Sequence, residues 1–125
     1  MYYNAVDSYR KQQVLVFSAE KQAALLMEAG QVSISKAIKA IKEENFNEMG
    51  SRLLRSIDII DECIFRLDIE SGEEAALNLL KIYDWWSRDI FEVAITHDIE
   101  RLKTIYEYMG ELKQTWESIR PLVSS

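Results

Sequence analysis

The sequence has 125 residues, of which 48% are hydrophobic and 29% are charged, and its formal net charge is −6. This length and composition predict one globular domain spanning residues 1–125, large enough to bury a core without a metal or a disulfide. The acidic balance argues against nucleic acid and anionic membranes as partners. Because we find no secretory signal and no apolar run long enough to span a bilayer, we expect a cytoplasmic protein without membrane insertion.

The first seventeen residues are too apolar to remain free in water. Tyr2, Val6 and Tyr9 have a rough helical spacing, and an uninterrupted apolar run follows at 14–17. We expect residues 1–17 to form a terminal arm packed over the rest of the domain.

Two long helices are predicted next, over residues 19–44 and 48–69. Ser18 can cap the first, and Glu20 suits its positive first turn. Gly30 inside this helix costs about 1 kcal/mol relative to Ala, so we expect a neighbouring backbone to approach closely there. The second helix carries apolar residues at heptad spacing, which we call its seam: Leu53, Ile57, Ile60, Ile64 and Leu67.

The third helix is predicted over 73–96 and the fourth over 98–119. Ser71 and Glu74 have the spacing of a capping box, Asp98 can cap the fourth helix, and Pro121 stops it. The seam of the third helix consists of Ala76, Leu79, Tyr83, Trp86, Ile90 and Val93. Four helices joined by short connections predict an all-α fold, an antiparallel up-down four-helix bundle.

Catalytic chemistry finds little support in the sequence. A di-iron bundle needs two Glu-x-x-His pairs, whereas His97 is the single histidine and Ala94 stands three residues before it. Cys63 has no candidate base other than His97 and reads as a buried structural thiol. The acidic residues Asp58, Asp61, Glu62, Glu73 and Glu74 are interpreted as solvent-exposed residues on helix surfaces. We therefore expect no enzyme activity, no metal and no cofactor.

Motifs spread over nearly the whole chain resemble the flagellin-specific export chaperones of the FliS family. The strongest is a Leu-Asp pair and an acidic glycine turn, followed by Ala-x-Asn-Leu and a Tyr-Asp-aromatic run. The matching segments in chain order are Met1-Tyr2, Asn4-Ala5, Tyr9, Gly30, Ile59-Ile60, Leu67-Asp68, Ser71-Gly72-Glu73, Ala76-Leu77-Asn78-Leu79, Ile82-Tyr83-Asp84-Trp85-Trp86 and Trp116.

Several departures from the family pattern indicate a divergent member. Ala19 stands where the family has the proline of a Ser-Pro helix start, and Glu73 replaces the second glycine of the turn. The segment 27–29 lacks the usual Leu-Tyr, and 87–89 lacks a basic pair.

The resemblance implies a cytoplasmic bundle that binds the disordered C-terminal segment of flagellin. Binding would prevent premature polymerisation and deliver flagellin to the type III export gate. The family's arm lies over the bundle, and Val6 and Tyr9 match its anchoring positions. The chaperone itself is expected to be a monomer or a weak homodimer.

A flagellin tail can fold into helices on the chaperone by placing apolar anchors between its helices. The candidate partner-binding residues lie off the seams, and they are Ile59, Ile82, Trp85, Ile105 and Tyr108. Two interpretations of these side chains remain open, because they either bind the partner or complete the core under the arm. The alternative function is a helical interaction module for a different export substrate or assembly partner.

Overall fold

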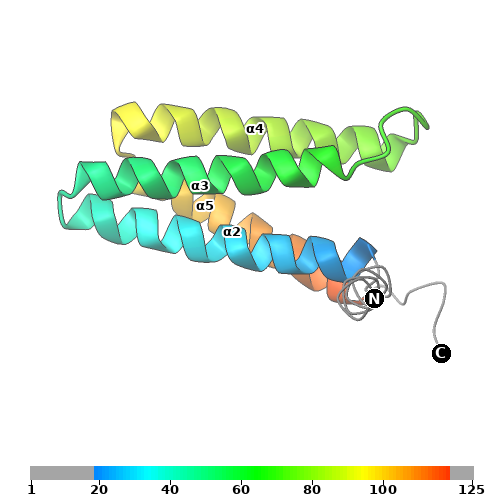
Figure 1. The fold of residues 1–125 in the computed structure, drawn as a ribbon, viewed down its shortest axis with the longest axis horizontal. Coiled ribbons are helices and arrows are strands. Elements are labelled where there is room, and N and C mark those ends of the chain that lie inside the picture. Colours follow the sequence, from blue (N-terminus) through cyan, green and yellow to red (C-terminus); the bar gives the residue numbers. More distant parts are fainter. Residues whose placement is uncertain (1–18, 119–125) are drawn as a thin grey trace, which may run out of the picture.

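A computed structural model describes residues 19–118, and the predicted arm lies outside this range. Its four helices are α2 (Ala19–Lys42), α3 (Phe46–Phe65), α4 (Glu74–Thr96) and α5 (Ile99–Ser118). Consecutive helices run antiparallel, which confirms the all-α four-helix bundle (Figure 1). None of the described helices is long and apolar enough to cross a membrane.

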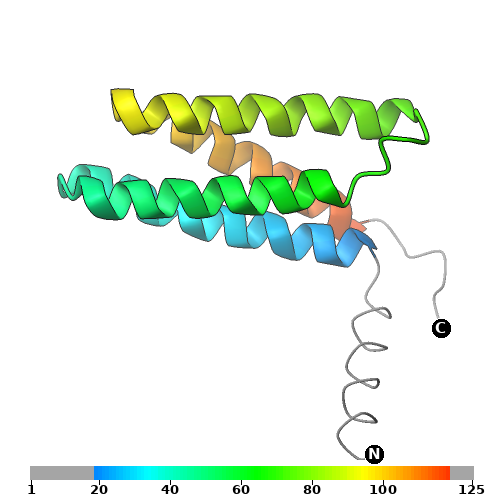
Figure 2. The same ribbon diagram turned by 45° about the horizontal axis from the view of Figure 1, so that its top comes forward.

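Helix α5 crosses the bundle instead of following α4. It begins beside the end of α4 and reaches the start of α2 at the other end of the molecule (Figure 2). Helix α2 therefore packs closely against both α3 and α5, whereas α4 packs against α3 and only loosely against α5. The side of α4 that faces α5 is left partly uncovered.

The turn between α2 and α3 lies two residues earlier than predicted, and Asn45 caps α3 there. Its Oδ1 accepts a hydrogen bond from the Glu48 N–H at 3.2 Å. The Asn45 N–H donates to the Ala40 carbonyl and the Glu44 N–H to the Ile41 carbonyl, the pattern of a Schellman motif. Glu44 occupies its left-handed position, with φ of 56°.

The turn between α3 and α4 corrects two expectations. Helix α3 ends at Phe65 instead of residue 69, because the chain leaves the helix to form this turn. Ser71 does not cap α4 in a capping box with Glu74. Its Oγ donates to the Asp68 carbonyl and accepts from the Glu73 N–H, so Ser71 closes the turn and Glu73 is the N-cap.

The turn between α4 and α5 forms as predicted at its cap. Asp98 Oδ1 accepts from the Glu100 N–H at 3.0 Å. His97 ends α4 in a left-handed conformation, with φ of 57°, and its ring stacks on Phe46 at a centroid distance of 4.3 Å. This stack joins the two turns at one end of the bundle.

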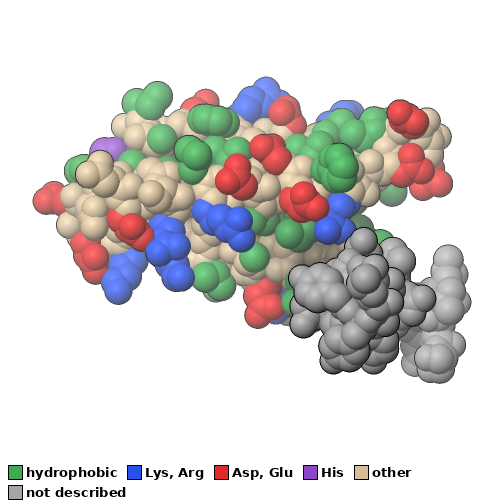
Figure 3. Space-filling view, in the orientation of Figure 1, with side chains coloured by type: hydrophobic (Ala, Val, Ile, Leu, Met, Phe, Trp, Pro, Cys, Tyr) green, Lys and Arg blue, Asp and Glu red, His purple; other side chains and the backbone are tan. Residues whose placement is uncertain are grey.

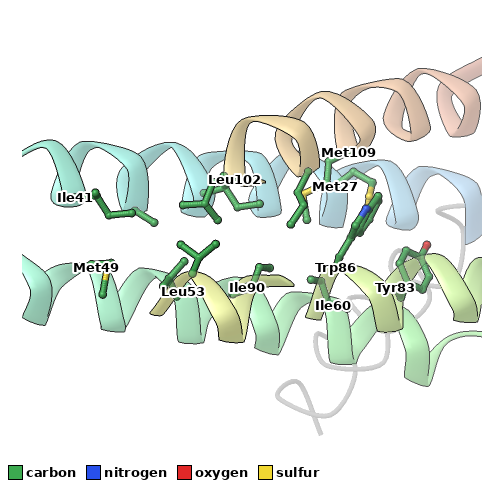
Figure 4. Packing of buried hydrophobic residues seen from close by; sticks show 14 of the residues in the cluster. Met27, Ile41, Met49, Leu53, Ile60, Tyr83, Trp86, Ile90, Leu102 and Met109 are labelled. Carbon is green, nitrogen blue, oxygen red and sulfur yellow. The ribbon is translucent and has the colours of Figure 1, made fainter. Parts of the chain in front are cut away.

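The core runs along the axis between all four helices (Figure 4). On α4 the predicted seam is confirmed at Tyr83, Trp86, Ile90 and Val93, all buried. On α3 the predicted seam is shifted. Leu53 and Ile60 are buried but Ile57, Ile64 and Leu67 are only half-buried, and the buried stripe consists of Met49, Leu53, Ser56, Ile59, Ile60 and Cys63.

Gly30 permits a close approach by a side chain, not by the backbone that we expected. A Cβ atom on Gly30 would lie 2.9 Å from the Sδ of Met109, a fully buried residue of α5. Nearby, the Ser33 and Ser56 hydroxyls both donate to the Arg52 carbonyl, at 2.7 and 3.0 Å. Both buried hydroxyls are therefore satisfied where α2 meets α3.

Candidate functional site: an aromatic surface on helices α4 and α5

Three of the five candidate partner-binding residues form one surface, which we call the Trp85 surface and define by Ile82, Trp85 and Tyr108. The rings of Trp85 on α4 and Tyr108 on α5 meet edge to face, with centroids 5.7 Å apart and planes at 67°. Trp85 is 38% exposed and Tyr108 is 45% exposed. Ile82, also 38% exposed, lies one turn before Trp85 on the same side of α4.

The buried neighbours of Trp85 hold this surface in place. Adjacent helical residues point about 100° apart, so Trp86 enters the core while Trp85 remains at the surface. Trp86 is 1% exposed and contacts the Tyr83 ring at 5.6 Å between centroids. Ile82 and Trp85 are thus presented by a helix whose opposite face is anchored in the core.

Ionic contacts join α4 and α5 at the end where the two helices meet. The Arg101 guanidinium on α5 hydrogen-bonds to the Glu92 carboxylate on α4 and lies 3.8 Å from Asp89. Asp98 of the turn lies 3.6 Å away. The hydrogen bond with Glu92 and the nearby carboxylates raise the pKa of Arg101 above its usual value. Arg101 therefore fastens the turn end of α4 to α5, while the helices separate farther along.

The other two candidates, Ile59 and Ile105, belong to the core and not to the surface. Ile59 is 4% exposed and Ile105 is fully buried. Ile105 continues the buried spacing of Leu102 and Met109 on α5. Ile59 faces α2, where its Cγ2 lies 3.8 Å from the position of a Cβ on Gly30. In this conformation neither side chain is accessible to a partner, and they fit the core interpretation.

A second feature is an apolar pocket of about 240 Å³ at the end of the bundle where α2 begins. Side chains from all four helices line it: Ala19, Glu20, Ala23, Leu26, Cys63, Arg66, Leu67, Tyr83 and Trp116. Burial raises the pKa of the Cys63 thiol to about 12. Burial, and to a lesser extent Cys63, also raises the pKa of Tyr83. Both groups therefore stay neutral at physiological pH, and the pocket is suited to apolar side chains.

Val6 and Tyr9, the expected arm anchors, lie outside the described residues. The pocket itself was not predicted from the sequence. Its lining comes from four helices, so it depends on how the helices pack. The apolar residues Leu26 and Trp116 were the only indication of it in the sequence. Within residues 19–118 no group of three or more His, Cys, Asp or Glu side chains could hold a metal ion.

Comparisons with known proteins agree with the resemblance. The model of the family described as flagellar protein FliS matches residues 2–123. A flagellar secretion chaperone FliS from Vibrio cholerae is 26% identical over 121 residues, covering 94% of this chain and 89% of the relative.

Two further relatives carry similar names. FliS from Salmonella typhimurium is 23% identical over 112 residues, covering 89% of this chain and 83% of that protein. The flagellar secretion chaperone FliSB from Pseudomonas aeruginosa is 30% identical over 95 residues, covering 76% of this chain and 75% of the relative. With a family match over nearly its whole length, the chain belongs to the FliS family of flagellar secretion chaperones.

Proposed function

We propose that this chaperone acts in the cytoplasm and binds the C-terminal segment of flagellin, with the Trp85 surface as the principal anchor site. The single observation that carries this proposal is the pairing of exposed Trp85 and Tyr108 across two helices of a FliS-family bundle. Partly exposed aromatic side chains offer a large contact area at a low cost in side-chain entropy. An apolar helix face of the flagellin segment would cover Ile82, Trp85 and Tyr108 together.

The loose packing of α4 against α5 supports this location. The two helices are joined near the turn by Arg101 and diverge farther along, beside Ile82 and Trp85. A partner helix can therefore bury apolar surface there without displacing the buried core. Folding of a disordered segment on binding costs several kcal/mol, so the bound area must extend well beyond three side chains.

Binding of this kind would keep flagellin from polymerising before export. Delivery to the type III export apparatus then requires the complex, and not the free chaperone, to be recognised at the export gate. The alternative partner is a different export substrate or assembly protein, which the same aromatic surface would serve.

The test is a calorimetric titration of the C-terminal flagellin peptide from the same organism into the full chain. We expect a Kd of about 1 μM or tighter, near −8 kcal/mol, with a negative heat-capacity change. Trp85→Ala should weaken binding at least about tenfold. Leu25→Ala, which removes a 52% exposed side chain from the outer side of α2, is the matched control and should leave the affinity unchanged. No heat at about 100 μM peptide would exclude flagellin as the partner.

We also propose that residues 1–17 pack over the pocket beside Ala19, with Val6 and Tyr9 as anchors. Ala19, the first described residue, lines the pocket, and most of the other lining groups are apolar. If the arm covers it, Val6→Ser and Tyr9→Ser should speed alkylation of Cys63, whose thiol lies on the pocket wall. Labelling rates equal to those of the wild type in both variants would contradict this placement.

A further inference from the structure

A second apolar surface lies on the outer side of α3 and α4, away from the core. We call it the α3/α4 strip and define it by five exposed side chains. They are Leu54 (61% exposed), Phe65 (84%), Leu77 (38%), Phe91 (61%) and Ile95 (84%). Hydrophobic side chains gather along α4 and the adjoining part of α3, with acidic side chains beside them (Figure 3).

Helical geometry places these side chains on the outer sides of the neighbouring helices α3 and α4. Leu54 and Phe65 are separated by eleven residues, close to three full turns of α3, so they point in nearly the same direction. Leu77 and Ile95 are separated by five full turns of α4, and Phe91 points within about 40° of them. Leu77 and Ile95 point about 180° from the buried Trp86 and about 80° from Trp85, so the strip lies on the outer side of α4, away from the core.

The length of the strip fits one partner helix. Leu77 and Ile95 lie about 27 Å apart along α4 at 1.5 Å per residue. A helix of about 18 residues covers that distance and could contact all five side chains. Phe65 and Ile95 are almost fully accessible, and the bundle makes little use of them for its own stability.

The charges beside the strip determine which partner fits it. Asp58 and Asp61 lie on the same side of α3 as Leu54 and Phe65, and neither has an ion pair or side-chain hydrogen bond within the described part of the chain. On the α4 edge, Arg88 is already paired with Asp84, which leaves Lys81 as one cation there. The acidic residues Glu70 and Glu73 follow at the α3–α4 turn.

We propose that the α3/α4 strip binds a basic amphipathic helix of a second protein, distinct from the client segment at the Trp85 surface. The apolar face of this helix would cover Phe65, Phe91 and Ile95, and its Lys or Arg side chains would face Asp58 and Asp61. A second copy of the chain fits poorly, since pairing two strips brings uncompensated carboxylates together on a molecule of net charge −6. The chaperone thus has two separate binding faces.

The probes are two designed helical peptides of about 18 residues, one with Leu and Lys and the other with Leu and Glu at the same positions. Calorimetry and residue-resolved amide NMR on the full chain measure affinity and location. We expect the Lys peptide to bind and to shift amide signals along the strip, with weaker binding between about 50 and 200 mM salt. The Glu peptide should bind at least about tenfold more weakly.

Paired variants separate the apolar contribution from the charged one. Phe65→Ser with Ile95→Ser should reduce affinity for the Lys peptide at least about tenfold, and helical circular dichroism checks that the bundle remains folded. Asp58→Asn with Asp61→Asn should reduce both the affinity and its salt dependence. Trp85→Ala is the matched control and should change neither the affinity for the Lys peptide nor its salt dependence. Because the same variant is expected to weaken flagellin binding, it distinguishes a failure of this inference from a failure of the flagellin proposal.

Four results of the peptide experiments would overturn the inference. They are equal binding of the two peptides, amide shifts outside the strip, unchanged affinity in the apolar variant, and displacement of the Lys peptide by the flagellin peptide. The last result would make the strip part of the client site. Concentration-dependent self-association that Phe65→Ser abolishes would assign the strip to a second copy instead.

Discussion

Gly30→Ala tests how tightly α2 and α5 pack, and its effect can be worked out from the structure. The new Cβ would lie 2.9 Å from Met109 Sδ and 3.1 Å from Met109 Cε. Met109 is fully buried and cannot turn into solvent. The resulting overpacking costs about 1–3 kcal/mol, whereas Ala gains about 1 kcal/mol of helix propensity over Gly. We expect a net loss of about 1 kcal/mol in the free energy of unfolding.

Gly50→Ala is the matched control, because no atom lies within 4 Å of its added Cβ. That variant should gain about 0.5–1 kcal/mol in urea unfolding. In a Met109→Ala background the clash is absent, so Gly30→Ala should then stabilise the protein by a similar amount. If Gly30→Ala stabilises the wild-type chain as much as Gly50→Ala does, the close approach of α5 to α2 is wrong.

Three further predictions follow from the same structure. Glu44→Gly should raise the free energy of unfolding by about 1 kcal/mol, since Glu44 holds a left-handed φ of 56° that glycine adopts without strain; a thermal melt without an increase would contradict this. Trp86→Ala should cost about 3–5 kcal/mol and Trp85→Ala about 1 kcal/mol in urea unfolding, and equal losses would refute the division into core and surface. Burial raises the pKa of Cys63 from 9.0 to about 12, so between these values only the unfolded state ionises. The stability that Cys63 contributes is complete below about pH 9 and falls by up to about 1.4 kcal/mol per pH unit above it. The difference in free energy of unfolding between the wild type and Cys63→Ala should therefore shrink from pH 8 to pH 10. If this difference stays constant over that range, the thiol is not buried.

The sequence predicted the elements whose pattern does not depend on how the helices are oriented. Tyr83, Trp86, Ile90 and Val93 keep heptad spacing and face the core wherever α4 lies. Asp98 caps α5 through a contact two residues away, which needs no tertiary information. The four helices followed from these local signals.

The exposure of individual side chains could not be predicted in the same way. Apolar residues occupy both sides of α3, so spacing alone did not show that the buried stripe passes through Ser56 and Cys63. Ile59 is buried because its side of α3 faces α2, where its Cγ2 lies 3.8 Å from the position of a Cβ on Gly30. The crossing of α5 toward α2 buries Ile105 and exposes Tyr108, and that crossing is a property of the whole bundle.

The capping at the α3–α4 turn shows the limit of motif spacing. Ser71 and Glu74 satisfied the capping-box pattern, but the Ser71 hydroxyl is used by the Asp68 carbonyl and the Glu73 N–H. Gly72, with φ of 70°, lets the chain reverse direction between Ser71 and Glu73. A hydroxyl engaged in closing the turn cannot also cap the first turn of α4.

Residue-resolved amide NMR with the flagellin C-terminal peptide tests the central claim most directly. We expect the largest shifts at Ile82, Trp85 and Tyr108, with the Trp85 indole N–H signal among them. The signals of Leu25 on the outer side of α2 should remain unchanged. Tight binding whose shifts bypass the Trp85 surface would contradict the account, because flagellin would then use another face of the bundle.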